Sequence, residues 1–197
     1  MAEIIESGNG NGKKAKVFKD LLLATRTVNH TEVQDANLDG RGWNINTGWI
    51  SSISANSALL YFLNKEDREF YIDAIAVGIK NGSAIDVQSI YLIKNPTGGT
   101  LVSAATDCDM IENRRVGSSK VFKNDTLAYK ATASGQTLTG GDDAALFAQN
   151  DQARLYATVD FVVEVGQAVG LRIETDGTFN GDVYAALIGH IVPDLED

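Results

Sequence analysis

The chain has 197 residues, a length typical of one large domain whose core needs no covalent crosslinks. Its formal net charge is −9 and its sequence pI is about 4.7, so we expect no broad basic face and no nucleic-acid partner. Cys108 is the only cysteine, which excludes an internal disulfide and a metal site built on paired cysteines. No apolar run approaches the length of a membrane-spanning helix, so we expect no membrane partner.

The first residues are rich in glycine and lysine. Ser7–Gly12 reads SGNGNG, and the lysines at positions 13, 14 and 16 follow it. We therefore expect a flexible N-terminal arm over residues 1–16 and a single domain over residues 17–197. Met1–Gly12 contains no apolar stretch of the kind found in a secretory signal. The apolar residues that follow fit either a helix face or an alternating strand, and we favour a strand over Leu21–Val28.

From Trp43 onward, short apolar runs separated by turn residues predict one strand after another. Gly, Asn and Asp must supply most turns, because the chain has 19 glycines and only 2 prolines. The charged segment Asn64–Glu69 and the segment Asn95–Gly99 (NPTGG) are expected loops, and Thr106–Ser119 is polar and irregular. The expected strands are Trp49–Ile53, Ala58–Leu63, Phe70–Ile79, Asp86–Ile93, Thr100–Ala105, Arg154–Val165, Ala168–Ile173 and Asp182–Val192.

The segment Arg154–Val165 gives the clearest strand signal. Apolar residues such as Leu155, Val159 and Val163 occupy one side of it, and residues such as Tyr156 and Glu164 occupy the other. About ten short strands with turn signals between them, and no helical periods alternating with them, indicate an all-β fold rather than a parallel α/β sheet. We expect an antiparallel β-sandwich with a jelly-roll-like topology.

The sequence contains little that points to catalysis. A Ser-His-Asp arrangement needs a histidine, and only His30 and His190 are available, with no G-x-S-x-G motif to serve either of them. Acidic residues gather in expected loops at Glu66–Asp67, Asp142–Asp143 and Asp194–Asp197, where solubility explains them better than glycoside hydrolysis does. We therefore expect no catalytic residues and no enzymatic activity.

One segment resembles a calcium-binding loop. Asp35, Asn37, Asp39 and Gly40 match positions 1, 3, 5 and 6 of an EF-hand loop, but Asn46 stands where a closing Glu belongs. We favour a polar turn there, and we expect no metal ion. The run Gly8–Lys13 does not fit a phosphate-binding loop, because Ser7 stands where the first glycine belongs and Lys14 stands where Ser or Thr belongs, so no nucleotide cofactor is expected either.

Three further features could take part in binding. The pair Arg114–Arg115 lies in a polar loop, where it is either solvated or an anchor for an acidic partner. Trp43 and Trp49 could form an aromatic platform, but packing in the core is the favoured interpretation for both. Cys108 is expected to be a small inert residue near the core.

Several segments form a pattern in collinear order over most of the chain. They are Thr25–Val28, Trp43–Gly48, Ser57–Tyr61, Asn64–Asp67 before the strand Tyr71–Val77, Leu92–Thr100, Asn113–Arg114, Gly117–Ser119, Leu138–Gly141 and Tyr184–Leu187. Each segment alone is only a turn or strand signal, but together and in order they resemble a family of capsid decoration (cement) or head structural proteins of tailed bacteriophages. The first 20 residues and Asp35–Gly40 match the family poorly.

This resemblance implies a jelly-roll-like β fold and a structural role on the exterior of the virion, with no catalytic residues. The implied partner is the major capsid protein of the same phage, and a homo-oligomer, with a trimer favoured, would attach to the capsid lattice at several points. Two other functions stay open from the residues alone. They are a receptor- or carbohydrate-binding module of a phage tail or fibre and, more remotely, a β-sandwich hydrolase.

Overall fold

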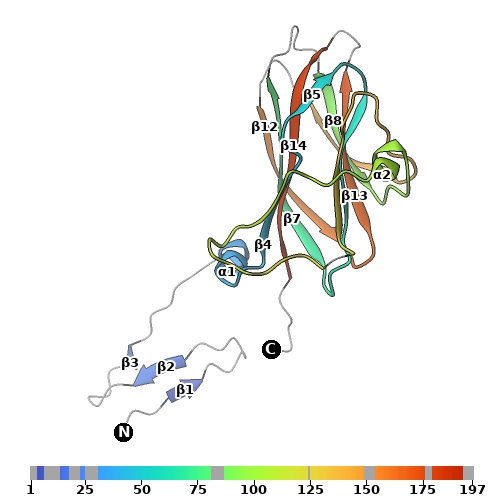
Figure 1. Ribbon diagram of the computed structural model, residues 1–197. Coiled ribbons are helices and arrows are strands. Elements are labelled where there is room, and N and C mark those ends of the chain that lie inside the picture. The colour runs from blue at the N-terminus through green and yellow to red at the C-terminus, as the bar shows by residue number, and fades with distance from the viewer. Residues whose placement is uncertain are drawn as a thin grey trace.

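The computed structural model describes residues 31–80, 87–123, 125–148, 154–175 and 179–192, together with three short N-terminal strands. Two antiparallel sheets pack face to face around one continuous apolar core (Figure 1). Strands account for 54% of the residues that the structure describes and helices for 8%, so the expected all-β sandwich is confirmed.

Ten strands form the main paths of the two sheets, and an eleventh, β5 (Ile50–Ile53), pairs with β14 beside them. The first sheet has the order β12 (Arg154–Val163), β7 (Phe70–Lys80), β14 (Gly181–Ile191), β4 (Gly42–Asn46) and β9 (Met110–Asn113). The second sheet has the order β10 (Leu127–Lys130), β6 (Ser57–Leu63), β13 (Ala168–Thr175), β8 (Val87–Lys94) and β11 (Asp142–Ala148).

The connectivity of eight of these strands is that of a jelly roll. Within the first sheet the neighbours are β4-β14-β7-β12, and within the second they are β6-β13-β8-β11. The chain crosses between the sheets at nearly every step, which pairs its first strands with its last ones, as the two Greek keys of a jelly roll require. The jelly-roll expectation is therefore confirmed.

Side-chain alternation explains how the strands form the core. In β12, Val163 is buried and Tyr156 is exposed, as the period of two predicts, although a register shift lies between Thr158 and Phe161. In β6, by contrast, six of seven residues are buried, because this strand lies between β10 and β13 and its sheet packs against the other one.

Two expected elements are wrong, and both are helices in the structure. Residues 35–38 belong to α1 (Glu32–Leu38) and not to a polar turn, because Thr31 and Gln34 form a capping box at its start. The capping bonds run from the Gln34 backbone N–H to Thr31 Oγ1 and from the Thr31 N–H to Gln34 Oε1, over 3.3 and 3.0 Å.

The second is α2 (Thr100–Ala104), where a strand was expected. Gly99 before it has φ 114° and Ala105 after it is left-handed, so the chain turns sharply at both ends. Leu101 is the buried residue of this short helix, and it supplies the apolar character that resembles a strand in the sequence.

The pattern also fails to predict β9, β10 and β11, and β9 lies within the segment 106–119 that was expected to be irregular. The side chains of β9 are mostly exposed because the strand forms an edge, so they show no apolar alternation. At the N-terminus, β1 (Ile4–Glu6), β2 (Lys14–Val17) and β3 (Leu23–Ala24) pair with one another in a separate three-stranded sheet. The rest of the expected arm over 1–16 and of the expected strand Leu21–Val28 lies outside the described residues.

Candidate interaction surface at the α1 end

Three segments distant in the sequence meet at one end of the sandwich, where α1 lies (Figure 1). They are residues 32–41, the loop 64–69 and the segment 113–126, and we call their joint surface the α1 end. Glu66 Oε1 joins the last two, because it accepts hydrogen bonds from the Lys123 backbone N–H at 2.7 Å and from Thr126 Oγ1 at 2.8 Å. The expected loop Asn64–Glu69 therefore contacts residues that lie beyond the expected polar segment Thr106–Ser119.

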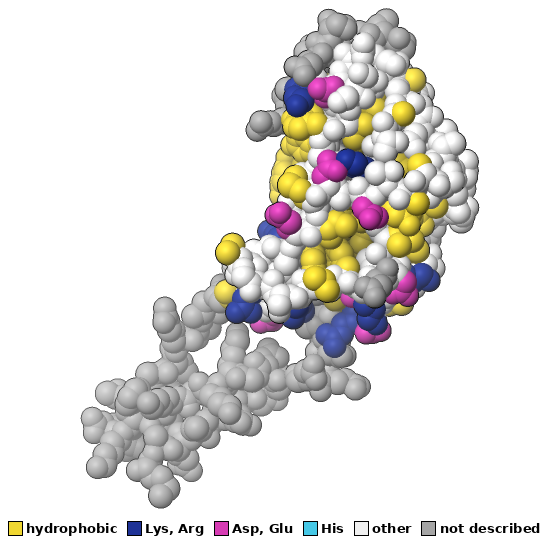
Figure 2. Space-filling view, viewed as in Figure 1, with side chains coloured by type: hydrophobic (Ala, Val, Ile, Leu, Met, Phe, Trp, Pro, Cys, Tyr) yellow, Lys and Arg dark blue, Asp and Glu magenta, His cyan; other side chains and the backbone are white. Residues whose placement is uncertain are grey.

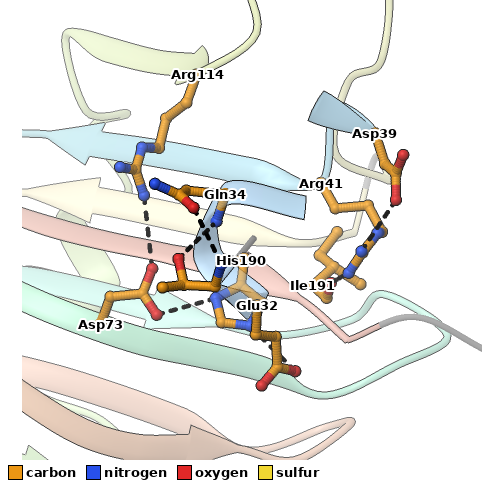
Figure 3. A network of polar contacts seen from close by, with 9 residues as sticks. Glu32, Gln34, Asp39, Arg41, Asp73, Arg114, His190 and Ile191 are labelled. Carbon is orange, nitrogen blue, oxygen red and sulfur yellow. Dashed lines mark hydrogen bonds and ion pairs between the residues drawn. The ribbon is translucent and has the colours of Figure 1, made fainter. Parts of the chain in front are cut away.

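A partly buried polar network lies between α1 and the first sheet (Figure 3). His190 Nδ1, from β14, lies 2.9 Å from Asp73 Oδ1 on β7, and Arg114 approaches the other oxygen of Asp73 at 3.5 Å. Glu32, the first residue of α1, places Oε1 3.7 Å from His190 Nε2. Tyr71 stacks on the imidazole at 5.5 Å between ring centroids.

Burial and two neighbouring side chains shift the pKa of Asp73 in opposite directions. Burial raises the pKa of Asp73 above its ordinary value, while His190 and Arg114 act in the opposite direction. A carboxylate in this position is therefore stabilised mainly by its two cationic or hydrogen-bonding neighbours. The network links β7, β14, α1 and the residue that follows β9.

The His190–Asp73 pair has the geometry of two members of a Ser-His-Asp triad, but the third member is missing. His190 Nε2 has no hydrogen-bond partner in the described part of the chain, and the 3.7 Å to Glu32 is too long for a hydrogen bond. The side chain of His190 is only 3% exposed, so substrate has no direct access to it. His190 thus joins β14 to β7 through Asp73, and His30 lies outside the described residues.

An aromatic stack anchors the segment 113–126 on the core. The rings of Phe122 and Trp43 lie 4.0 Å apart, and Phe62 and Phe70 contact Phe122 from the core. Polar bonds attach the same segment to the end of α1, since Lys120 Nζ donates to the Asp39 carbonyl at 2.8 Å. The described part of the segment that follows β9 is therefore held at several points although it contains no helix or strand.

Two valines of this anchored segment project into solvent. Val116 is 101% exposed and Val121 is 82% exposed, and Leu38 at the end of α1 is exposed as well. Figure 2 shows charged side chains of both signs gathered toward this end of the visible face. Two clefts, of about 680 and 510 Å³, open beneath the segment, and the rings of Trp43 and Phe122 form part of the wall of the larger one.

The calcium hypothesis finds no support at Asp35–Gly40. The first four residues of the motif are helical, and Asp39 forms an ion pair with Arg41 at 3.1 Å. Within the described ranges, no three His, Cys, Asp or Glu side chains converge on a common point.

The other residues singled out in the sequence are scattered. Arg114 belongs to the Asp73 network, and Arg115 is exposed beside it. Among the acidic clusters, Asp143 pairs with Arg172 at 3.3 Å, and Asp194–Asp197 lies outside the described residues. Cys108 is buried as expected, and burial raises the pKa of its thiol to about 12.

The two tryptophans have different environments. Trp43 is buried, as expected, but Trp49 is 43% exposed, so the expectation that both pack in the core is wrong. Ile50 and Ile53 are the residues of β5 that face the core, and Trp49 lies next to Ile50 and outside that strand. The Trp49 ring meets Tyr184 edge to face at 4.9 Å, and Lys80 Nζ lies 4.2 Å above it.

The exposed valines and the anchoring role of Phe122 were missed in the sequence. The available signal was three apolar residues, at 116, 121 and 122, within an otherwise polar stretch.

Comparison with known proteins adds nothing here, because no family model, curated protein or solved structure matches the chain. None of the described helices is long and apolar enough to cross a membrane.

Proposed function

We propose that this protein is a structural component of a tailed-phage virion that binds the assembled capsid and stabilises it. The proposed partner is the major capsid protein of the same phage, and the proposed location is the capsid exterior. The collinear motifs quoted above support the proposal, and the jelly roll is a fold used in viral capsid proteins among others.

The observation that carries the proposal is the exposure of Val116 and Val121 on a segment that is firmly anchored. These two side chains stay largely in contact with water after folding, so they contribute little to the stability of the isolated domain. Their removal from water becomes a favourable contribution to binding when a second protein covers them. Exposed apolar surface of this kind marks interaction sites. Because Phe122 and Lys120 already hold the segment, its ordering adds little entropy cost to binding.

We further propose that the protein acts as an oligomer, with a trimer favoured. A trimer would present three copies of the α1 end, so several weak contacts could act together on a symmetric lattice. A protein that binds the assembled shell but not its dissociated subunits stabilises the shell by mass action.

Calorimetry on assembled capsids tests this proposal. Capsids that lack the protein, from the phage whose genome encodes it, would be heated with increasing amounts of purified protein. The melting temperature of the capsid shell should rise with the concentration of added protein and then reach a plateau. A transition that does not move at saturating protein would refute the stabilising role. Bovine serum albumin at the same concentration controls for crowding.

A second function is favoured by one specific observation, the exposure of Trp49. An exposed indole beside Tyr184 offers an apolar ring face of the kind on which sugar rings stack. The test is a titration with a host surface glycan, followed by tryptophan fluorescence. Quenching that is lost in Trp49→Ala would place the protein in the receptor-binding class.

A further inference from the structure

The strand β12 forms a free edge of the first sheet (Figure 1). It pairs with β7 on one side and, within the described ranges, with no strand on its other side. It has ten residues, which makes it longer than most strands of globular proteins. Such an edge presents a row of backbone N–H and C=O groups to which another strand can add.

The usual protection of a sheet edge is almost absent from β12. Soluble proteins shield their edges with prolines, lysines, charged side chains or bulges that twist the strand away. Between Leu155 and Val163 the strand has no proline and no lysine, and Asp160 is its one charged residue. Exposed and partly buried side chains alternate along it without interruption, even across the register shift with β7. The edge is therefore regular enough for a further strand to pair along it.

Apolar side chains stay partly uncovered along this edge. On the inner face, Leu155, Val159 and Phe161 pack against the core but are only partly buried. A cleft of about 450 Å³ opens beside them between the two sheets, with Phe161 in its wall. On the outer face, Tyr156 is 65% exposed and Val162 is 42% exposed. A strand added to this edge would remove apolar surface from water on both faces.

The exposed side chains of β12 form a palindrome. From Tyr156 to Val162 the outer face reads apolar, polar, polar, apolar, with Thr158 and Asp160 in the middle. If a second copy of β12 lies antiparallel with Val159 opposite Val159, each Tyr156 faces a Val162 and each Thr158 faces an Asp160. Each Thr158 hydroxyl can then donate to a carboxylate of the other copy.

The neighbouring registers fit less well. If the centre of the pairing moves to Asp160, the two Asp160 carboxylates face each other, which is destabilising. If it moves to Thr158, each Tyr156 faces an Asp160 and each Val162 loses its apolar partner. The outer face therefore selects one register, in which the strand is complementary to a second copy of itself.

The inner face fits the same register. There the large side chain of Phe161 faces the small Ala157, and Leu155 faces Val163. Pairs of a large and a small side chain fill the space between facing positions without overpacking. Val163 also lines the cleft between the sheets, so Leu155 of the second copy would lie at the mouth of that cleft.

We infer that two copies of this chain associate by antiparallel pairing of their β12 strands about a two-fold axis at Val159. The first sheets of the two copies then continue into each other. Both copies use the same surface, so this contact closes at two chains. It is separate from the proposed three-fold contact, and both contacts together would give six chains. The inference does not rest on capsid binding.

Disulfide trapping tests the register. In Y156C/V162C the two cysteines of one chain are six residues apart, about 20 Å along the strand, so they cannot bond to each other. In the inferred pairing each lies directly opposite the other cysteine of the second copy, at a Cα separation of about 4.5–5.5 Å that a disulfide can span. Mild oxidation of the full-length variant should give a covalent dimer on a non-reducing gel. Cys108 is buried and does not compete.

The single variants Y156C and V162C are the matched controls. In each of them the cysteine faces a valine or a tyrosine of the second copy, so little covalent dimer should form. A double variant that stays monomeric on the gel would overturn the inference. Equal amounts of covalent dimer in the single and double variants would overturn it as well. Circular dichroism of the reduced proteins checks that all three are folded.

Two substitutions of Thr158 test the same register without cysteines. Thr158→Lys places an ammonium group opposite Asp160 of the second copy, whereas Thr158→Asp places a carboxylate there, and each dimer contains two such contacts. The dissociation constant of the dimer should fall about fivefold in the lysine variant and rise about fivefold or more in the aspartate variant. Val116→Lys changes the net charge equally at an exposed position outside β12 and should leave the constant unchanged. Equal tightening in both lysine variants would overturn the register.

Sedimentation equilibrium of the full-length protein gives these constants and the mass of the assembly. The wild type should have the mass of two chains, or of six where the three-fold contact also forms. A mass of one chain or of three chains at every concentration tested would overturn the inference. No capsid enters these measurements, so their failure leaves the proposed function standing, and a failure of capsid binding leaves the β12 pairing standing.

Discussion

Asp73 Oδ1 on β7 and His190 Nδ1 on β14 lie 2.9 Å apart, and this contact joins two neighbouring strands beneath α1. His190→Ala removes the nearer of the two partners of Asp73 and leaves one oxygen of a partly buried carboxyl group without its hydrogen bond. We expect the free energy of unfolding to fall by about 1–3 kcal/mol, the usual cost of leaving such a group unpaired. Urea titration measures the change, and a loss below about 0.5 kcal/mol would contradict the role given to the network.

Asp73 should also give the stability a specific pH dependence. Burial raises its pKa in the folded protein, so the folded protein still holds the Asp73 proton at a pH where the unfolded chain has lost it. The stability that this group contributes is therefore present below its ordinary pKa and is lost as pH rises through the raised value.

Asp73→Asn tests this sign, because asparagine does not titrate. The difference in unfolding free energy, wild type minus variant, should decrease as pH rises from about 4 toward neutrality. Denaturant titrations at a series of pH values give this difference. A difference that grows with pH would mean that the partners of Asp73 outweigh its burial.

Cys108 should be unreactive in the folded protein. Burial raises the pKa of its thiol to about 12, so almost no thiolate is present at pH 8, and the side chain is also shielded from solvent. Labelling by a disulfide reagent should be very slow in buffer and rapid in denaturant. Rapid labelling under native conditions would show that the region around Cys108 opens readily.

Chelation of calcium should leave the thermal stability unchanged. The segment 35–38 is helical and Asp39 pairs with Arg41, so the oxygen ligands of a calcium loop are not assembled. Melting curves with calcium and with excess chelator should superimpose. A melting temperature several degrees lower in chelator would restore the calcium hypothesis for Asp35–Asp39.

The long strands could be predicted from the sequence because each of them shows an alternating or continuous apolar pattern. In β7, β12 and β14 this pattern reflects the burial of one face or both, and the expected ends lie within two residues of the observed ones. α1 could have been recognised too, because Thr31 and Gln34 have the spacing of a capping box. The helix α2 spans only Thr100–Ala104 and buries a single residue, Leu101, so the sequence shows no helical period of apolar residues there.

The candidate surface was harder to predict than the fold. It depends on long-range contacts, such as Glu66 with Lys123 and Trp43 with Phe122, which no local pattern encodes. The edge strand β9 shows no alternation because it has no buried face of its own. His190 appears in the sequence as an ordinary residue of an apolar strand, and only the pairing of β14 with β7 places it beside Asp73.

The most direct test of the central claim is a binding isotherm on assembled capsids. Purified protein would be added at increasing concentration to capsids that lack it, and the bound fraction would be measured after sedimentation of the particles. The account predicts saturable occupancy, with a plateau at a fixed number of copies per particle and weaker binding by V116S/V121S. No sedimentation of the protein with the capsids at any concentration would contradict the proposed function.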